Sequence, residues 1–149
     1  TIPLLYLSAY PQPGVKPLSE SRNGVAGCYR MSGRKPEDID MIELPDNSPW
    51  HYFAYLDVIL GLEPGEAERM LRNGDTDPID GKLPVCPSGG ISSTGEAVVA
   101  QGMYQVFELV KQLKGEAGAR QVKRDVEVGL AQTYGYAGNN AACIVSKAW

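Results

Sequence analysis

A glycine-rich segment near the middle of the chain, residues 83–96, constrains the fold more than any other part of the sequence. It reads LPVCPSGGISSTGE and leads directly into a helical pattern of apolar residues. Two adjacent glycines, followed by a third, deliver unpaired backbone N–H groups to the start of a helix, which is a common way to bind an oxygen anion. We therefore expect the amides from Gly89 to Gly95 to form a cradle for such a group.

The same segment lacks the side chains that usually carry out acid–base chemistry. No histidine, lysine or arginine lies between Leu83 and Lys111. Glu96 falls in the first turn of the predicted helix, where the helix dipole favours a carboxylate. The segment thus predicts the backbone of an active site without its usual acid or base.

Length and composition bound the class of protein. The chain has 149 residues, 43% hydrophobic and 21% charged, which suits one globular domain. Its net charge of −4 comes from interspersed residues, which does not indicate nucleic-acid binding. The sequence shows no apolar run long enough for a membrane span and no signal peptide. Three scattered cysteines, Cys28, Cys86 and Cys143, predict free thiols and a cytoplasmic location.

Strand and helix patterns alternate along the chain. Short apolar runs bounded by turn residues predict strands at 2–10, 39–44, 126–133 and 141–146. Helical spacing predicts helices at 21–33, 50–62, 66–73 and 96–113, with a turn at 35–38 and a loop at 73–82. The apolar stripe of the last helix, expected in the core, consists of Val99, Met103, Val106 and Val110. This order predicts an α/β layered fold with a mixed sheet.

Several common site motifs are absent from the sequence. Residues 89–96 lack the Gly-Lys-Ser/Thr of a phosphate-binding loop, and no Gly-x-Gly-x-x-Gly follows the first predicted strand. No Cys/His pair has zinc-ligand spacing, and no Gly-x-Ser-x-Gly elbow occurs. We therefore expect no nucleotide site, no metal site and no serine hydrolase.

Six segments of the chain together resemble one known family. They are Lys35–Leu44, Asn73–Thr76, Gly81–Val85, Pro87–Gly90, Gln105–Gly118 and Val128–Ala131. In this order they resemble the C-terminal half of the thiolase superfamily, most of all sterol-carrier-type and archaeal acetoacetyl-CoA thiolases. The resemblance covers nearly the whole chain. We therefore expect residues 1–149 to be a single thiolase-like C-terminal domain, with the N-terminal half absent from this chain.

The resemblance implies a fold, a substrate class and partners. It implies a mixed five-stranded sheet of βαβαβαββ type with helices on both faces. In such proteins the N-terminal half supplies the nucleophilic cysteine, and the C-terminal half supplies acid–base and oxyanion groups. The substrate would be a coenzyme A thioester, with no covalently bound cofactor. The expected partners are an N-terminal half or homologous subunit, buried against this chain in an oligomer, and a small OB-fold protein.

Several family motifs are replaced in this chain. The sterol-carrier-type His-Asp-Cys-Phe becomes Pro-Asp-Asn-Ser at 45–48, which keeps Asp46 alone, and Gly-His-Pro becomes Gly-Glu-Ala at 95–97. Cys86 replaces the Asn before Pro-Ser-Gly-Gly, and the final glycine-rich loop reads Tyr-Gly-Tyr-Ala-Gly at 134–138. A neutral imidazole can donate a hydrogen bond to a thioester oxygen, whereas an ionised Glu96 would repel a forming enolate. Ordinary Claisen condensation or thiolysis is therefore disfavoured.

The candidate residues each have two interpretations. Glu96 is either an acid favoured by the helix dipole or a general base in a retro-aldol or related C–C cleavage. As a proton donor it would need a pKa raised by burial. Tyr134 and Tyr136 either pack in the final loop or polarise a carbonyl, as tyrosines do in some thiolase-like aldolases. Those tyrosines replace the two family histidines, whereas Pro45 and Glu96 hold these places here.

The remaining candidates have simpler alternatives. Asp46 is either a turn or N-cap residue or an acid. His51 is either a surface or core residue or an acid–base group, and Cys86 is a small buried hydrophobe. The predicted substrate-binding residues are Gly89, Gly90, Ser92, Gly95 and Gly135.

Three functional hypotheses remain from the sequence. The chain is part of a thiolase-like acyl-CoA enzyme, an acyltransferase or a retro-aldolase, that needs an N-terminal half or partner. Alternatively, it is a non-catalytic subunit that completes a partner's fold. In the third hypothesis it is a free-standing acyl-CoA or lipid-binding domain.

Overall fold

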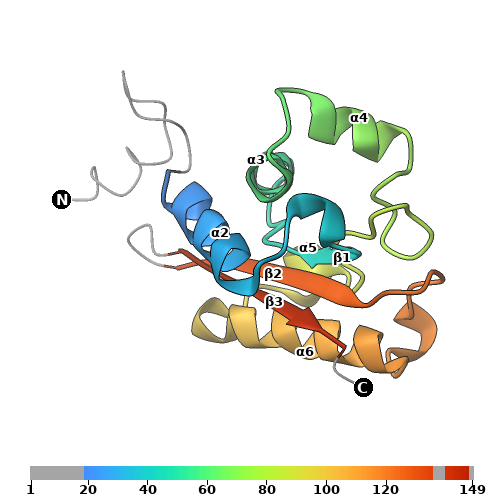
Figure 1. Cartoon of the computed structure of the whole chain (residues 1–149). Coiled ribbons are helices and arrows are strands. Elements are labelled where there is room, and N and C mark those ends of the chain that lie inside the picture. The colour runs from blue at the N-terminus through green and yellow to red at the C-terminus, as the bar shows by residue number, and fades with distance from the viewer. Residues whose placement is uncertain (1–18, 136–139, 148–149) are drawn as a thin grey trace.

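A mixed sheet lies between two sets of helices in the structure, a computed structural model that describes residues 19–135 and 140–147 (Figure 1). Its strands are β1 (Met41–Glu43), β2 (Val128–Tyr134) and β3 (Asn140–Ser146), in the order β1-β2-β3. β1 is parallel to β2, β2 is antiparallel to β3, and Val85 adds an isolated parallel bridge to Ile42. The mixed sheet is confirmed. Within the described residues it has three strands rather than five, and the strand predicted at 2–10 lies outside them.

Helices cover both faces of the sheet, as predicted. α2 (Ser19–Ser32) and α3 (Pro49–Leu60) lie on one face, and α6 (Gln101–Lys114) lies on the other (Figure 1). The remaining helical elements are α4 (Glu66–Arg72), α5 (Gly90–Thr94), and the 3₁₀ turns η1 (Pro36–Asp38), η2 (Val98–Ala100) and η3 (Gly118–Arg120). The described strands and the helices up to residue 72 agree with prediction to within two residues at each end. α5 was not predicted.

The sheet separates two hydrophobic cores, because successive side chains of a strand point to opposite faces. Ile42 and Leu130 belong to the larger core, which packs against α2 and α3. Met41 and Ala131 belong to the smaller core, which packs against α6. β1 therefore contributes side chains to both cores.

The start of α6 differs from the prediction. The helix begins at Gln101 rather than at residue 96, because Gly95 ends α5 at φ 82° and ψ 161° and η2 intervenes. Glycine alone adopts such a backbone conformation readily. Glu96 therefore precedes α6 and is not in its first turn, so the interpretation based on the helix dipole is wrong.

The face that α6 turns toward the sheet also differs from the prediction. A Cβ atom at Gly129 would lie 2.8 Å from Leu109 Cδ2, so this glycine lets α6 approach the strands closely. With Leu109 facing inward, Val99 and Met103 are 97% and 72% exposed. The prediction that these two residues belong to the core is wrong, whereas Val106 does pack against the smaller core.

Candidate functional site

The loop after β1 is held against α5 by the side chain and carbonyl of Asp46. Ser92 donates its hydroxyl to Asp46 O at 2.7 Å and its backbone N–H to Asp46 Oδ1 at 3.2 Å. The Asp46 carboxylate also lies directly against Gly90, where no room remains for a Cβ atom. Asp46 thus satisfies an amide at the start of α5, an N-capping type of interaction made across the fold.

Four amides of the glycine-rich segment are already paired within the chain. Their acceptors are Cys86 O for Gly89 (2.9 Å), Ser88 Oγ for Gly90 (3.0 Å), Asp46 Oδ1 for Ser92 (3.2 Å) and Ile91 O for Gly95 (2.9 Å). The expectation of an open oxyanion cradle built from these amides is therefore wrong. The loop folds back on itself and uses side chains to satisfy α5, because buried backbone donors are rarely left unpaired.

A hydrogen-bonded cluster forms around Tyr134 at the end of β2. The phenol donates from Oη to Glu96 Oε1 at 2.9 Å and accepts from Asn47 Nδ2 at 2.8 Å. These residues lie 38 and 87 positions from Tyr134 in the sequence, so only the fold brings them together. The structure therefore unites two sequence-predicted residues, Glu96 and Tyr134, with one that sequence reasoning missed, Asn47.

Aromatic stacking fixes the position of the Tyr134 ring. The His51 ring stacks on Tyr134 with centroids 5.6 Å apart and on Tyr55 with centroids 5.8 Å apart. Ser48 Oγ lies 2.8 Å from His51 Nδ1 and accepts the His51 backbone N–H as the N-cap of α3. His51 is thus a half-buried part of the cluster. The Ser-Pro sequence at 48–49, a helix-start signal, could have indicated this placement.

The environment keeps the ring groups of this cluster neutral near pH 7. Burial, followed by the hydrogen bond and charge of Glu96, raises the pKa of Tyr134 above its usual value. Burial lowers the pKa of His51, partly offset by Glu96. Tyr134 is therefore a protonated phenol and His51 a neutral imidazole. Gly135 follows β2 and is exposed, and Tyr136 lies outside the described residues.

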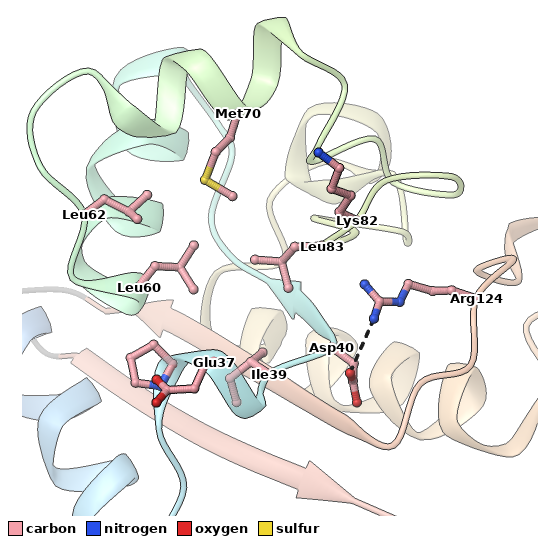
Figure 2. A pocket seen from close by; sticks show the side chains of 10 residues that line it. Glu37, Ile39, Asp40, Leu60, Leu62, Met70, Lys82, Leu83 and Arg124 are labelled. Carbon is pink, nitrogen blue, oxygen red and sulfur yellow. Dashed lines mark ion pairs between the residues drawn. The ribbon is translucent and has the colours of Figure 1, made fainter.

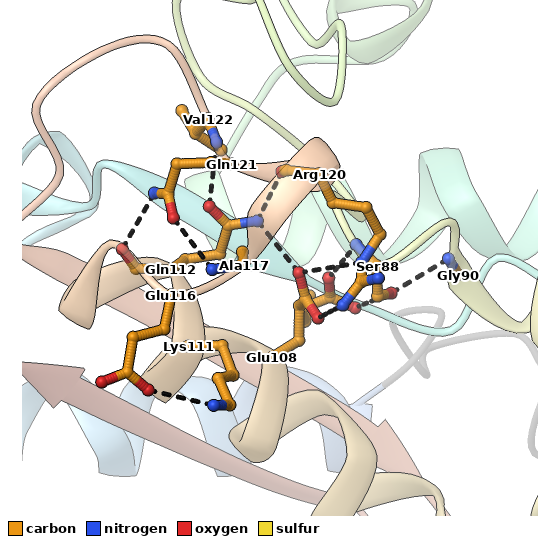
Figure 3. A network of polar contacts seen from close by, with 11 residues as sticks. Ser88, Gly90, Glu108, Lys111, Gln112, Glu116, Ala117, Arg120, Gln121 and Val122 are labelled. Carbon is orange, nitrogen blue, oxygen red and sulfur yellow. Dashed lines mark hydrogen bonds and ion pairs between the residues drawn. The ribbon is translucent and has the colours of Figure 1, made fainter.

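A second polar network joins the turn at Ser88 and Gly90 to α6 and η3 (Figure 3). The buried Glu43 carboxylate accepts the Ser88 backbone N–H at 2.9 Å and the Ser88 hydroxyl at 2.8 Å. Buried Glu108 pairs with Arg120 at 2.9 Å between Oε2 and Nη2. Because Ser88 Oγ also accepts the Gly90 N–H, Glu43 holds the turn that leads into α5.

We expect Glu43 to make folding stability depend on pH. Burial raises its pKa from 4.5 to about 7, so the folded state binds this proton more tightly than the unfolded state. The stabilisation is therefore present below about pH 4.5 and is lost as the pH rises to about 7, by up to about 1.4 kcal/mol per pH unit. In Glu43→Gln, urea unfolding at about pH 5 and about pH 8 should lack this component. Exposed Glu127→Gln is the control, and identical pH profiles in all three proteins would contradict the assignment.

One cavity of this chain lies away from the Tyr134 cluster. It has a volume of about 520 Å³ and opens at the start of β1, between the loop after α3 and residues 82–83 (Figure 2). Leu60, Leu62 and Met70 line it together with charged side chains, among them the Asp40–Arg124 ion pair at 3.8 Å. Within residues 19–135 and 140–147, no group of three or more His, Cys, Asp or Glu side chains could hold a metal ion. No helix in this part is long and apolar enough to cross a membrane.

Comparison with known proteins decides the family. A family model described as thiolase C-terminal domain-like matches residues 8–148. The chain belongs to this family. Acetyl-CoA acetyltransferase of Methanothermobacter thermautotrophicus is 37% identical to this chain. The match covers 80% of this chain and 31% of the relative. Human sterol carrier protein 2 is 39% identical over 79% of the chain and 21% of the relative.

Two further similar proteins are a thiolase subunit and an aldolase. The benzoylsuccinyl-CoA thiolase subunit BbsB of Thauera aromatica is 34% identical over 72% of this chain and 28% of the relative. The solved structure of the Ltp2-ChsH2(DUF35) aldolase superposes with a TM-score of 0.71 at 26% identity, over 85% of this chain and 31% of that one. The predicted thiolase-like fold and relationship are therefore confirmed. The thiolase-like chain spans between a fifth and a third of these relatives' length, at 21% to 31%.

Proposed function

We propose that the chain is part of a thiolase-like enzyme that cleaves or forms a carbon–carbon bond in a coenzyme A thioester, with retro-aldol cleavage as its reaction. The observation that carries this proposal is the hydrogen bond from Tyr134 to Glu96, with Asn47 as second partner. A phenol joined to a carboxylate can relay a proton, which a retro-aldol reaction requires. The aldolase and CoA thiolase among the similar proteins support this reaction class.

The proposed step starts from a β-hydroxyacyl thioester. Its hydroxyl gives a proton to the Tyr134 oxygen while the phenol proton passes to Glu96. The bond between the α and β carbons breaks, the β carbon becomes a ketone or aldehyde, and the electron pair enters the thioester enolate. The same proton then returns through Tyr134 to the enolate carbon. A phenol oxygen has two lone pairs, and Asn47 occupies one, so the second can accept the substrate hydroxyl.

We assign the missing parts of the site to an N-terminal half or homologous subunit that binds the apolar face of α6. We define this face by exposed side chains of α6 and of η2 directly before it, which are Val98, Val99, Met103, Tyr104 and Phe107, between 57% and 97% exposed. An exposed apolar patch of this kind is typical of a protein interface. The small OB-fold partner stays a prediction from the resemblance, as does the cytoplasmic location.

A turnover assay tests the proposed reaction. The protein, in the assembly with which it purifies, should convert a β-hydroxyacyl-CoA into a carbonyl compound and a shortened acyl-CoA, both measured by mass spectrometry. Glu96→Gln keeps an acceptor for Tyr134 but removes the carboxylate that takes the proton, so turnover should fall at least about tenfold. Glu63→Gln, an exposed control, should retain it. Full turnover in Glu96→Gln would remove the proton relay from the mechanism. A lack of cleavage in an assembly with intact acyl-CoA binding would favour the non-catalytic subunit.

We expect Phe107→Asp to weaken partner association strongly. A charge in the middle of the apolar face of α6 leaves a carboxylate to be buried at the interface, which should weaken association about 100-fold. The folded chain should keep its melting temperature, because Phe107 is 57% exposed. Size-exclusion chromatography with light scattering measures the assembly. Met31→Asp is the control, because it places the same side chain at an 88% exposed apolar residue of α2, on the opposite face of the sheet. Equal association of both variants would contradict the interface.

A further inference from the structure

A separate groove opens beside the Tyr134 cluster, between α3, α4 and α5. Its volume is about 350 Å³. Pro49, Tyr52 and Phe53 line it from the start of α3, and Leu71 lines it from α4. The groove is therefore walled mainly by apolar and aromatic side chains, which is typical of sites for small apolar groups.

The walls and floor of the groove are held in place by contacts within the chain. The rings of Tyr52 and Phe53 meet edge to face, with centroids 5.5 Å apart at 87°. On the floor, Ser92 is bonded to Asp46 through both its hydroxyl and its backbone N–H. A groove with fixed walls loses little conformational freedom when a ligand enters, which favours binding.

The charge of the groove selects between the two ends of a coenzyme A thioester. Among the described residues that line it, none is lysine or arginine, and Asp46 contributes a carboxylate. The nucleotide end of coenzyme A carries phosphates, which proteins bind with cations and N–H groups. A neutral, apolar acyl group suits this lining better than the nucleotide does.

Asn47 connects the groove to the proposed reaction centre. It lines the groove and donates from Nδ2 to Tyr134 Oη at 2.8 Å. We infer that the groove binds the bulky apolar part of the acyl group whose reacting carbon lies at Tyr134, a part of about two rings in size. This inference rests on the proposed function. An apolar cavity of about 150 Å³ accommodates benzene, so the larger groove has room for more than one ring.

The affinities of two thioesters test this site. 3-Phenylpropionyl and acetyl thioesters of N-acetylcysteamine lack the nucleotide and differ only in the acyl group. Leu71 is 46% exposed on α4, so Leu71→Trp can fill the groove from its edge without entering the core. Titration calorimetry on the assembly with which the protein purifies should show affinity for the phenylpropionyl thioester falling about tenfold or more, and for the acetyl thioester less than about twofold.

Two further variants make the result decisive. Met31→Trp adds the same ring to α2 at a side chain that is 88% exposed, and it should change neither affinity. Leu71→Gln removes apolar surface without adding bulk. It should also lower the affinity for the phenylpropionyl thioester and leave that for the acetyl thioester unchanged. This variant replaces Leu71→Trp as the test if Leu71→Trp lowers the melting temperature. Equal loss for both thioesters, or no loss, would overturn the groove assignment. A Leu71 variant that loses protein association but keeps its selectivity between the two thioesters would also overturn the assignment, because the groove would then bind a partner chain. Selective binding without any retro-aldol turnover would overturn the proposed function and leave the groove standing.

Discussion

Tyr134→Phe should reduce retro-aldol turnover by about 100-fold to 10,000-fold, the range expected when a positioned proton-transfer group is removed. The variant loses the hydroxyl that donates to Glu96 and accepts from Asn47. It keeps the ring that stacks on His51 and Tyr55, so the fold around the site should remain. Turnover is measured by carbonyl product release, and affinity for the acetyl thioester by calorimetry.

Tyr29→Phe is the matched control for the loss of a phenol oxygen. Tyr29 Oη donates to Ile59 O at 3.0 Å, between α2 and α3 and outside the Tyr134 cluster. Its removal should lower stability by about 1 kcal/mol and leave turnover per folded molecule unchanged. If Tyr134→Phe and Tyr29→Phe retain the same turnover, Tyr134 has a packing role alone.

Gly90→Ala should be among the most destabilising single-methyl additions to this chain. Gly90 has φ 68°, and a Cβ atom there would overlap the Asp46 carboxylate. Positive φ and overpacking each cost about 1–3 kcal/mol, so the free energy of unfolding should fall by about 2–6 kcal/mol. The midpoint of guanidinium unfolding at unchanged slope measures this loss.

Gly115→Ala is the control that measures the backbone part of this effect. Gly115 ends α6 at φ 71°, but nothing lies within 4 Å of an added Cβ atom. Its substitution should cost about 1 kcal/mol, the backbone contribution alone. Equal losses in the two variants would show that the contact between α5 and the loop after β1 is looser than described.

The locally encoded elements of the fold were predictable from the sequence. The helix predicted at 50–62 is observed at Pro49–Leu60, because Ser48 caps its start and Gly61 ends it at φ 68°. The strands predicted at 126–133 and 141–146 are observed at Val128–Tyr134 and Asn140–Ser146. Capping residues, glycines and side-chain periodicity act over a few positions, so they can be recognised in the sequence without a tertiary structure.

Two site predictions failed for reasons of long-range geometry. The amides at 89–95 were expected to be open, but Ser88 and Asp46 satisfy those of Gly90 and Ser92, and Asp46 comes from a different strand end. Glu96 was predicted at the start of a helix, but it precedes η2 and contacts Tyr134 instead. Asp46 lies 46 positions from Ser92, and Tyr134 lies 38 positions from Glu96, so spacing alone carries no information about these two contacts. The contact of Ser88 with Gly90 spans only two positions.

The sequence by itself determined the family, the α/β class and the positions of the described strands, since motifs and local propensity suffice for these. Tertiary structure alone decided that Asn47, Glu96 and Tyr134 meet, because this requires the pairing of β1 with β2 and the packing of α5 on the loop after β1. It also decided which face of α6 is buried. That choice depends on close approach at Gly129, which turns Leu109 inward and leaves Met103 and Phe107 exposed.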